Sequence, residues 1–294
     1  MPAEQIPTTQ VPILKRVGEL LQRYEVLFCD VWGVLHDGHR VYEHADSALN
    51  RFRHQGGTVI LVSNAPRPAD RVVEVLDEKG VSRTAWDDLV TSGDLAIAHT
   101  RARGFRRVFR IGPERDNSLF ERIGAEVVDL PAAEAIVVTG LNDERRDTAE
   151  GYRPVLERAL ARRLPLVCAN PDLAVHVGAL LLPCAGAVAA LYETMGGPVF
   201  WAGKPNPAAY AEALARAETI RKRPVDRRQI LAVGDALRTD LAAAAGLGID
   251  FLFVAGGLHR DEALSAGALE PRRLAALLAD APRGVLAAIS ALRW

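Results

Sequence analysis

The stretch VLFCDVWGVLHDG, residues 26–38, begins as an apolar run and then meets a carboxylate at Asp30. Short apolar runs rich in β-branched and aromatic residues are typical of buried β-strands. In open α/β sheets, ligands bind just outside the carboxyl ends of the strands. The stretch therefore predicts a strand that delivers Asp30 to a site at the edge of a sheet.

The same pattern recurs along the chain. Eight short apolar runs are each followed by a helical pattern: EVLFCD, GTVILVSN, RRVFRIG, EAIVVTG, LPLVCANPD, PVFWAGKP, QILAVGDA and DFLFVAGG. Strands that alternate with helices indicate a parallel sheet with helices on its faces. We therefore predict an α/β fold.

The reactive strand ends gather in two blocks, roughly residues 25–90 and 185–260. Residues 92–183 have their own strand and helix alternation but fewer reactive side chains. We predict a core made of residues 1–91 and 184–294, with residues 92–183 inserted as a second domain. The apolar spacing predicts a helix over residues 1–24 and two short helices over 271–294.

The composition restricts the class of function. The chain has 294 residues, of which 49% are hydrophobic and 25% charged, and its net charge is -1. Nucleic-acid and membrane-surface partners need a patch of one sign, so neither is expected. The three cysteines, Cys29, Cys168 and Cys184, predict buried free thiols. With no secretory signal and no membrane span, we expect a cytoplasmic protein.

Several familiar catalytic motifs are absent from the sequence. It has no GxSxG, HExxH or GxGxxG pattern, and AGKPNP has Pro205 where a phosphate loop needs Ser or Thr. His36, His39 and His44 follow Asp30 closely, but their spacing fits no single helical face. We expect them in a solvent-facing or locally hydrogen-bonded loop, and a ligand role stays open.

The strand ends together point to phosphoryl transfer. They supply, in this order, Asp30, Ser63, Lys204, and the pair Asp235 and Asp240. A carboxylate can attack phosphorus and divide one displacement into two easier ones. Mg²⁺ suits a site with one or two carboxylates and a phosphate, because it reduces their mutual repulsion. A lysine and a hydroxyl can then hold the remaining phosphoryl oxygens.

These segments resemble the haloacid dehalogenase-like hydrolase superfamily, and more narrowly its NagD-like subfamily IIA. The resemblance rests on DVWGVLHDG, VSNAPRP, TSGDLAIA, ANPD, CAGAVAALYETMGGPVFWAGKPNPAAY and VGDALRTDLAAAAGLGIDFLFVAGG, which span about four fifths of the chain. It implies a Rossmann-like, doubly wound parallel core with an inserted α/β cap of the C2 type. It also implies a Mg²⁺-dependent phosphatase of a small phosphorylated metabolite, such as a sugar phosphate, a nucleotide or pyridoxal phosphate, and it allows a homodimer.

The resemblance assigns roles residue by residue. Asp30 would be the nucleophile and a metal ligand, Ser63 would bind phosphate, and Asn64 would support the same loop. Lys204 would neutralise Asp30 and the phosphoryl group.

The metal ligands implied are Asp235, the backbone carbonyl of Trp32, and Asp240 through water or indirectly. Asn170 and Asp172 match a recurring segment of the cap, but the residues themselves indicate no role for them.

Trp32 departs from the family pattern, which places a second aspartate two residues after the nucleophile. That aspartate normally protonates the leaving oxygen, help worth about 10² to 10⁴ in rate. Three interpretations stay open. The protein is a hydrolase that takes its proton from Asp37, from a histidine such as His36 or from the substrate; it is a phosphate-binding relative without catalysis; or, with least support, it is a haloacid dehalogenase.

Overall fold

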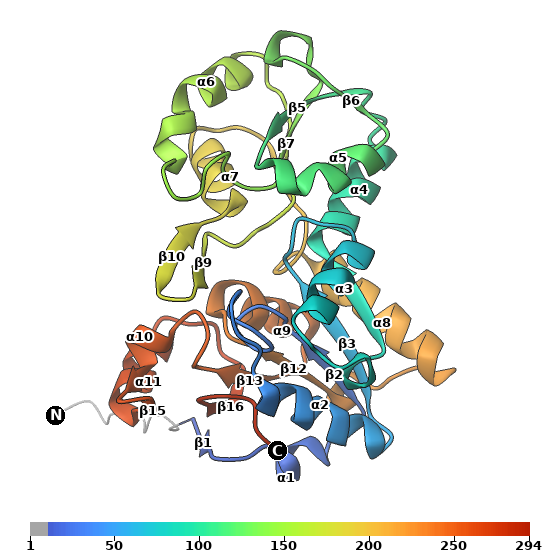
Figure 1. Ribbon diagram of the computed structural model, residues 1–294, viewed down its shortest axis with the longest axis vertical. Coiled ribbons are helices and arrows are strands. Elements are labelled where there is room, and N and C mark those ends of the chain that lie inside the picture. Colours follow the sequence, from blue (N-terminus) through green and yellow to red (C-terminus); the bar gives the residue numbers. More distant parts are fainter. Residues whose placement is uncertain (1–10) are drawn as a thin grey trace, which may run out of the picture.

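The computed structural model describes residues 11–294 and is organised around two β-sheets, one above the other in Figure 1. The larger sheet has seven strands in the order β1-β16-β13-β12-β2-β3-β4, and all neighbours run parallel. Its strands are β1 (Ile13–Leu14), β2 (Val26–Cys29), β3 (Thr58–Ser63), β4 (Asp88–Thr91), β12 (Ile230–Gly234), β13 (Asp250–Val254) and β16 (Val285–Ile289). The predicted α/β fold with a Rossmann-like core is confirmed.

Helices cover both faces of this sheet because its strands are apolar on both sides. In β2, Leu27 and Cys29 enter one hydrophobic cluster, while Val26 and Phe28 enter the other. Successive side chains of a strand point to opposite faces, so a continuous apolar run serves both layers. The first layer contains α2 (Glu43–His54) and α3 (Ala69–Glu78); the second contains α8 (Pro207–Arg221), α9 (Ala242–Leu247) and α11 (Pro271–Leu278).

The second sheet has five parallel strands in the order β11-β8-β7-β5-β6. Its strands are β5 (Arg107–Ile111), β6 (Glu126–Val127), β7 (Ala135–Val138), β8 (Leu166–Cys168) and β11 (Val199–Trp201). It too is covered on both faces, by α4 (Ser92–Ala102) and α5 (Asn117–Arg122) on one and by α6 (Arg153–Ala161) and α7 (Ala185–Thr194) on the other.

Strand β11 and helix α7 belong with the second sheet, which affects where the boundary between core and cap falls. β11 pairs with β8, and Val188 and Tyr192 of α7 are buried in the same cluster as strands β7 and β8. The expected boundary between residues 183 and 184 therefore falls before two elements that pack with the second sheet. We propose that the cap begins near residue 92, as expected, and continues to about residue 202.

A hairpin connects the two parts of the molecule. It consists of β9 (Ala174–Val177) and β10 (Leu180–Pro183), which pair antiparallel. Figure 1 shows it extending from the upper part toward the lower sheet and α10 (Arg260–Ala263). The sequence analysis did not predict this hairpin.

Both ends of the chain differ from expectation. Of the helix predicted over residues 1–24, residues 1–10 lie outside the described part, Ile13 and Leu14 form β1, and α1 spans only Gly18–Leu21. Near the other end, α11 is helical as predicted, but β16 replaces the second helix. In both places a strand pairs with an available sheet edge, β1 with β16 and β16 with β13. Tertiary pairing thus overrides the helix propensity of the alanine-rich segment.

The expectation of buried free thiols is met. Cys29, Cys168 and Cys184 are buried and free. No helix within residues 11–294 has both the length and the apolar character needed to cross a membrane. A short antiparallel pair, β14 (Leu264–Ser265) with β15 (Ala268–Leu269), completes the described elements.

Candidate active site

The candidate site lies where the strand order of the larger sheet reverses. From β2 the chain proceeds through β3 to β4 on one side, whereas β12, which pairs with β2 on the other side, leads to β13 and β16. Such a switch point leaves a crevice at the carboxyl ends of the strands. Asp30 follows β2 and Asp235 follows β12, so the sheet places the two carboxylates on adjacent strands at this crevice.

Three carboxylates surround one lysine at this point. The Lys204 ammonium donates hydrogen bonds of 2.6 Å to Oδ1 of Asp30 and of 2.6 Å to Oδ1 of Asp240. Asp30, Asp235 and Asp240 each offer an oxygen, and these oxygens lie within 4.8 Å of one another. All four side chains are buried.

The site therefore has more negative charge than its lysine can balance. Burial raises the pKa of Asp30, and the Asp240 carboxylate raises it further, against the opposing effect of Lys204. Burial and the carboxylates of Asp30 and Asp240 raise the pKa of Asp235 well above its usual range. Burial opposes the charge on Lys204, but Asp240 and Asp30 outweigh it, so the pKa of Lys204 is raised. An additional cation would relieve this imbalance.

The free oxygens show where such a cation fits. Both oxygens of Asp240 are engaged, one by Lys204 and one by the N–H of Ala236 at 3.1 Å. Asp235 Oδ2 accepts from the N–H of Leu258 at 2.6 Å. In the described part of the chain, Asp30 Oδ2, Asp235 Oδ1 and the Trp32 carbonyl receive no hydrogen bond. Asp235 Oδ1 and the Trp32 carbonyl, together with one oxygen of Asp30, suit Mg²⁺, which prefers a few oxygen ligands completed by water and phosphate.

Two glycines make room for Asp235. A Cβ on Gly33 would lie 1.8 Å from Asp235 Oδ2, and one on Gly257 would lie 2.0 Å from the same atom. Gly33 also has a φ of +83°, a conformation that favours glycine. Glycine is therefore required at both positions to keep this carboxylate in place.

Of the predicted phosphate-binding residues, Lys204 lines the cavity, whereas Ser63 and Asn64 lie outside its lining. Ser63, the last residue of β3, is buried, and its hydroxyl accepts from the N–H of Ala65 at 3.2 Å. The Asn64 amide is fully engaged: it accepts from the Lys204 N–H at 2.9 Å and donates to the Lys204 carbonyl and to Asp172. Asn64 thus fixes the backbone that carries Lys204.

Trp32 links the loop that follows β2 to the hairpin. Its indole N–H donates to the backbone carbonyl of His176 at 2.9 Å, and its ring meets the ring of His36 edge-on. Arg260, the first residue of α10, also holds the hairpin. It donates to the Gly178 carbonyl at 2.6 Å and contacts Nδ1 of His176 at 3.0 Å. The Trp32 side chain is therefore an anchor for β9.

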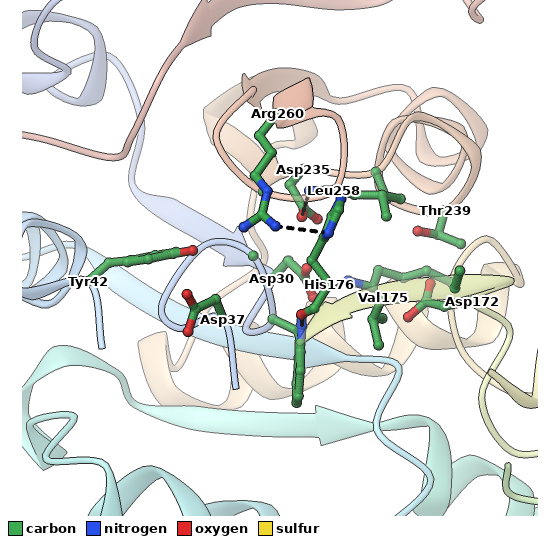
Figure 2. A pocket seen from close by; sticks show the side chains of 16 residues that line it. Asp30, Asp37, Tyr42, Asp172, Val175, His176, Asp235, Thr239, Leu258 and Arg260 are labelled. Atoms are coloured by element: carbon green, nitrogen blue, oxygen red, sulfur yellow. Dashed lines mark hydrogen bonds and ion pairs between the residues drawn. The ribbon is translucent and has the colours of Figure 1, made fainter. Parts of the chain in front are cut away.

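The hairpin lies over a small cavity, and Figure 2 shows His176 among the residues that line it with Asp30 and Asp235. Its volume is about 30 Å³, which admits a water molecule or two but no phosphate ester. The predicted residues that line it are Asp30, Trp32, Lys204 and Asp235. Lining residues that the sequence analysis left without a role include Asp172, Tyr42, His176, Thr239 and Arg260.

The histidines that follow Asp30 are not a metal cluster in this structure. His36 is buried, and its Nδ1 accepts from the N–H of Gly38 at 3.1 Å. His39 and His44 are exposed, and the carboxylate group that could hold a metal includes none of the three. His36 therefore lies in a locally hydrogen-bonded loop, which is one of the two loop environments expected for these histidines.

His36 makes a testable contribution to stability. Burial, aided by the charge of Lys79, lowers the pKa of His36 from 6.5 to about 4. Between these values the unfolded chain binds more protons than the folded one, so the stabilisation present above pH 6.5 is lost as the pH falls to about 4. The shift corresponds to about 3 kcal/mol.

His36→Asn keeps an acceptor for the Gly38 N–H but removes the titrating ring. Urea denaturation from pH 7 to pH 4 should therefore show that the wild-type free energy of unfolding falls by about 3 kcal/mol more than that of the variant. Parallel pH profiles would contradict the assignment.

Comparison with known proteins agrees with this arrangement. Two family models match, one described as haloacid dehalogenase-like hydrolase over residues 27–126 and one as HAD-hydrolase-like over residues 201–281. A crystal structure of a haloacid dehalogenase-like hydrolase from Brucella suis is 40% identical, with a TM-score of 0.84, and covers 95% of this chain and 99% of its own. NagD from Escherichia coli shares the fold at 19% identity, with a TM-score of 0.63 and coverage of 91% and 96%.

A curated phosphatase is also similar to this chain in sequence. D-glycerol 3-phosphate phosphatase from Mycobacterium tuberculosis is 33% identical over 250 residues, which is 82% of this chain. The chain spans 65% of the length of that relative. The matches define a hydrolase built on a Rossmann-like core with a separate cap region. The chain belongs to the haloacid dehalogenase-like hydrolase family, and it shares its fold with NagD.

Proposed function

We propose that the protein is a Mg²⁺-dependent phosphatase that hydrolyses a small phosphate monoester through an aspartyl-phosphate on Asp30. The observation that carries the proposal is the position of Asp30 at the switch point, where Lys204 holds one of its oxygens at 2.6 Å. The other oxygen is left free for attack on phosphorus. Family membership supports hydrolysis as the reaction class.

The residues would divide the work as follows. Lys204 orients the Asp30 carboxylate, and Asp240 fixes Lys204. Asp30 through Oδ1, Asp235 and the Trp32 carbonyl would hold the cation, which when bound offsets the repulsion between a carboxylate and a phosphoryl group. The Ser63 hydroxyl and the backbone N–H of Asn64 are our proposed donors to the phosphoryl oxygens.

The reaction then has two displacements. Asp30 Oδ2 forms a bond to phosphorus while the bond from phosphorus to the ester oxygen breaks. Water then attacks the phosphorus of the aspartyl-phosphate, which releases phosphate and regenerates the Asp30 carboxylate. The substrates we propose are sugar phosphates, nucleotides, pyridoxal phosphate and, from the curated relative, glycerol phosphate.

A second candidate is a phosphate-binding relative without catalysis. It is favoured by one observation: the Trp32 indole N–H is engaged with the carbonyl of His176, and an indole cannot act as a general acid. Dehalogenation has less support, because Asp235 joins the other carboxylates as a metal acid would.

An activity assay separates the candidates. With Mg²⁺ we expect release of phosphate from 4-nitrophenyl phosphate and from at least one alkyl ester of the panel, and none with EDTA. The same assay with chloroacetate tests for halide release. If no ester is turned over while calorimetry detects Mg²⁺ and phosphate binding, the binding relative is the correct description.

A further inference from the structure

The cavity contains two carboxylates besides those around Lys204, Asp37 and Asp172. Asp37 is a poor proton donor. Its Oδ1 accepts from the N–H of His39 at 2.9 Å and of Arg40 at 2.7 Å. Burial opposes its charge, but these backbone hydrogen bonds outweigh burial and lower the pKa of Asp37, so it is ionised at neutral pH.

The histidines of the cavity region are no better suited. Burial lowers the pKa of both His36 and His176, so each ring is neutral at pH 7. The Nδ1 atom of His36 is occupied by the N–H of Gly38, and that of His176 by Arg260. Neither ring combines a free nitrogen facing the reaction with a proton to donate at low energetic cost.

Asp172 differs from these groups in its surroundings. It enters from the cap after β8, and the turn that holds it is closed by its own N–H, which donates to Oδ1 of Asn170 at 3.1 Å. Its Oδ1 accepts from the Asn64 amide at 3.0 Å, while its Oδ2 has no hydrogen-bond partner among residues 11–294. Figure 2 shows the side chain beside Val175, on the opposite side of the cavity from Asp37.

The charges around Asp172 come from both parts of the molecule. Those that face it are the cations Lys204 and Arg238 and the carboxylates Asp30, Asp235 and Asp240. Burial is the largest influence and raises the pKa of Asp172, although Lys204 and the Asn64 hydrogen bond oppose it. A carboxyl group with a raised pKa carries a proton nearer to neutral pH, as a general acid requires.

We propose that Asp172 is the general acid and base of the reaction, a role that Trp32 cannot fill. The proposal rests on the proposed phosphatase function. The Asp172 carboxyl group gives its proton to the ester oxygen as the bond from that oxygen to phosphorus breaks. In the second step the resulting carboxylate takes a proton from the water that attacks phosphorus, so Asp172 ends each cycle protonated.

The cap therefore contributes a catalytic group to a nucleophile that belongs to the other sheet. Asn64 joins the two, because its amide contacts both Asp172 and the Lys204 backbone. The acid can be in place only when the cap is seated on the core.

Asp172→Asn tests the proposal with little structural change. The amide oxygen still accepts from Asn64, but it has no proton to exchange. For alkyl phosphates we expect kcat to fall by about 10² to 10⁴. For 4-nitrophenyl phosphate, whose leaving group needs no proton, the first step should survive and the second should slow. The variant should then give a burst of about one nitrophenolate per site and accumulate aspartyl-phosphate.

Controls keep the test specific. Glu157→Gln, an exposed change on α6 of the cap, should match the wild type. Asp172→Glu, which keeps a carboxyl group, should recover part of the alkyl-ester activity. The descending limb of kcat/KM at high pH for the alkyl ester should be present in the wild type and absent in Asp172→Asn.

The outcomes separate this proposal from the broader one. Wild-type protein without turnover of either ester overturns the phosphatase function and Asp172 with it. Active wild type with a variant that loses both esters equally and shows no burst, or that loses neither, overturns only the role of Asp172. If Asp172→Asn fails to fold by circular dichroism, the ratio of alkyl to aryl turnover in Asp172→Glu decides: a fall relative to the wild type supports the role, and an unchanged ratio overturns it.

Discussion

Asp30→Asn is expected to abolish phosphate release from every ester, by about four orders of magnitude or more, because an amide oxygen does not displace an ester oxygen from phosphorus. The substitution is nearly isosteric, and the amide oxygen can still accept from Lys204, so the fold should persist. It also removes one negative charge from a buried group of three. We therefore expect the metal-free variant to be at least as stable as the wild type.

The measurement is kcat for 4-nitrophenyl phosphate at saturating Mg²⁺, with mass spectrometry to detect phosphate on the intact chain. The matched control is Asp280→Asn, an exposed aspartate without a hydrogen-bonding partner in the described structure, which should keep wild-type activity. Retention of a tenth of the activity by Asp30→Asn would show that another residue is the nucleophile.

Lys204→Met is expected to damage stability as well as activity. Lys204 is only 2% exposed and is the cation that contacts both Asp30 and Asp240. Removing one partner of a buried charge pair typically costs about 3 to 5 kcal/mol, since the other charge is left unpaired. The thioether fills similar space but compensates none of this charge.

The pH dependence of this variant has a defined sign. Burial and neighbouring carboxylates already raise the folded-state pKa values of Asp30 and Asp235, and removal of Lys204 removes the charge that opposes this shift at Asp30. The folded state then binds more protons, so stability should recover as the pH is lowered toward the unfolded pKa of about 4. Mg²⁺ should also restore stability, by about 2.7 kcal/mol at 100 times its dissociation constant.

Urea denaturation with and without Mg²⁺ measures both effects. Lys15→Met, a change at an exposed lysine outside the cavity lining, is the control and should change neither. A Lys204→Met protein as stable as the wild type in EDTA at pH 8 would mean that the carboxylates are not charged together in the folded state.

The core and its reactive strand ends could be predicted because each depends on local pattern. All eight predicted strands are present, as β2, β3, β5, β7, β8, β11, β12 and β13. Asp30 and Asp235 converge as expected, since parallel strands bring their carboxyl ends to one edge. Lys204 and Asp240 join them by other routes: Lys204 follows β11 of the second sheet, and Asp240 lies in the helical turn Leu237–Leu241.

Strands β4 and β16 and the position of Asp172 could not be predicted, because they depend on contacts that local sequence pattern does not encode. β4 is only four residues long and begins on Asp88, so it lacks the apolar run that marked the other strands. β16 is alanine-rich and becomes a strand only because β13 offers an edge. The Asp172 segment was noticed in ANPD, but its place beside Asn64 follows from how the cap sits on the core.

The hairpin over Asp30 also sets a limit on what can be dephosphorylated. Trp32 and Arg260 fasten β9 and its turn to the core by hydrogen bonds, above a cavity of about 30 Å³. Under the proposed function, a phosphoserine on the surface of a folded protein could not reach Asp30 past this roof, whereas a small diffusible ester needs only the hairpin to move aside. Each cycle of the proposed reaction would then break and remake these hydrogen bonds, so the rate of product release would be tied to the indole of Trp32.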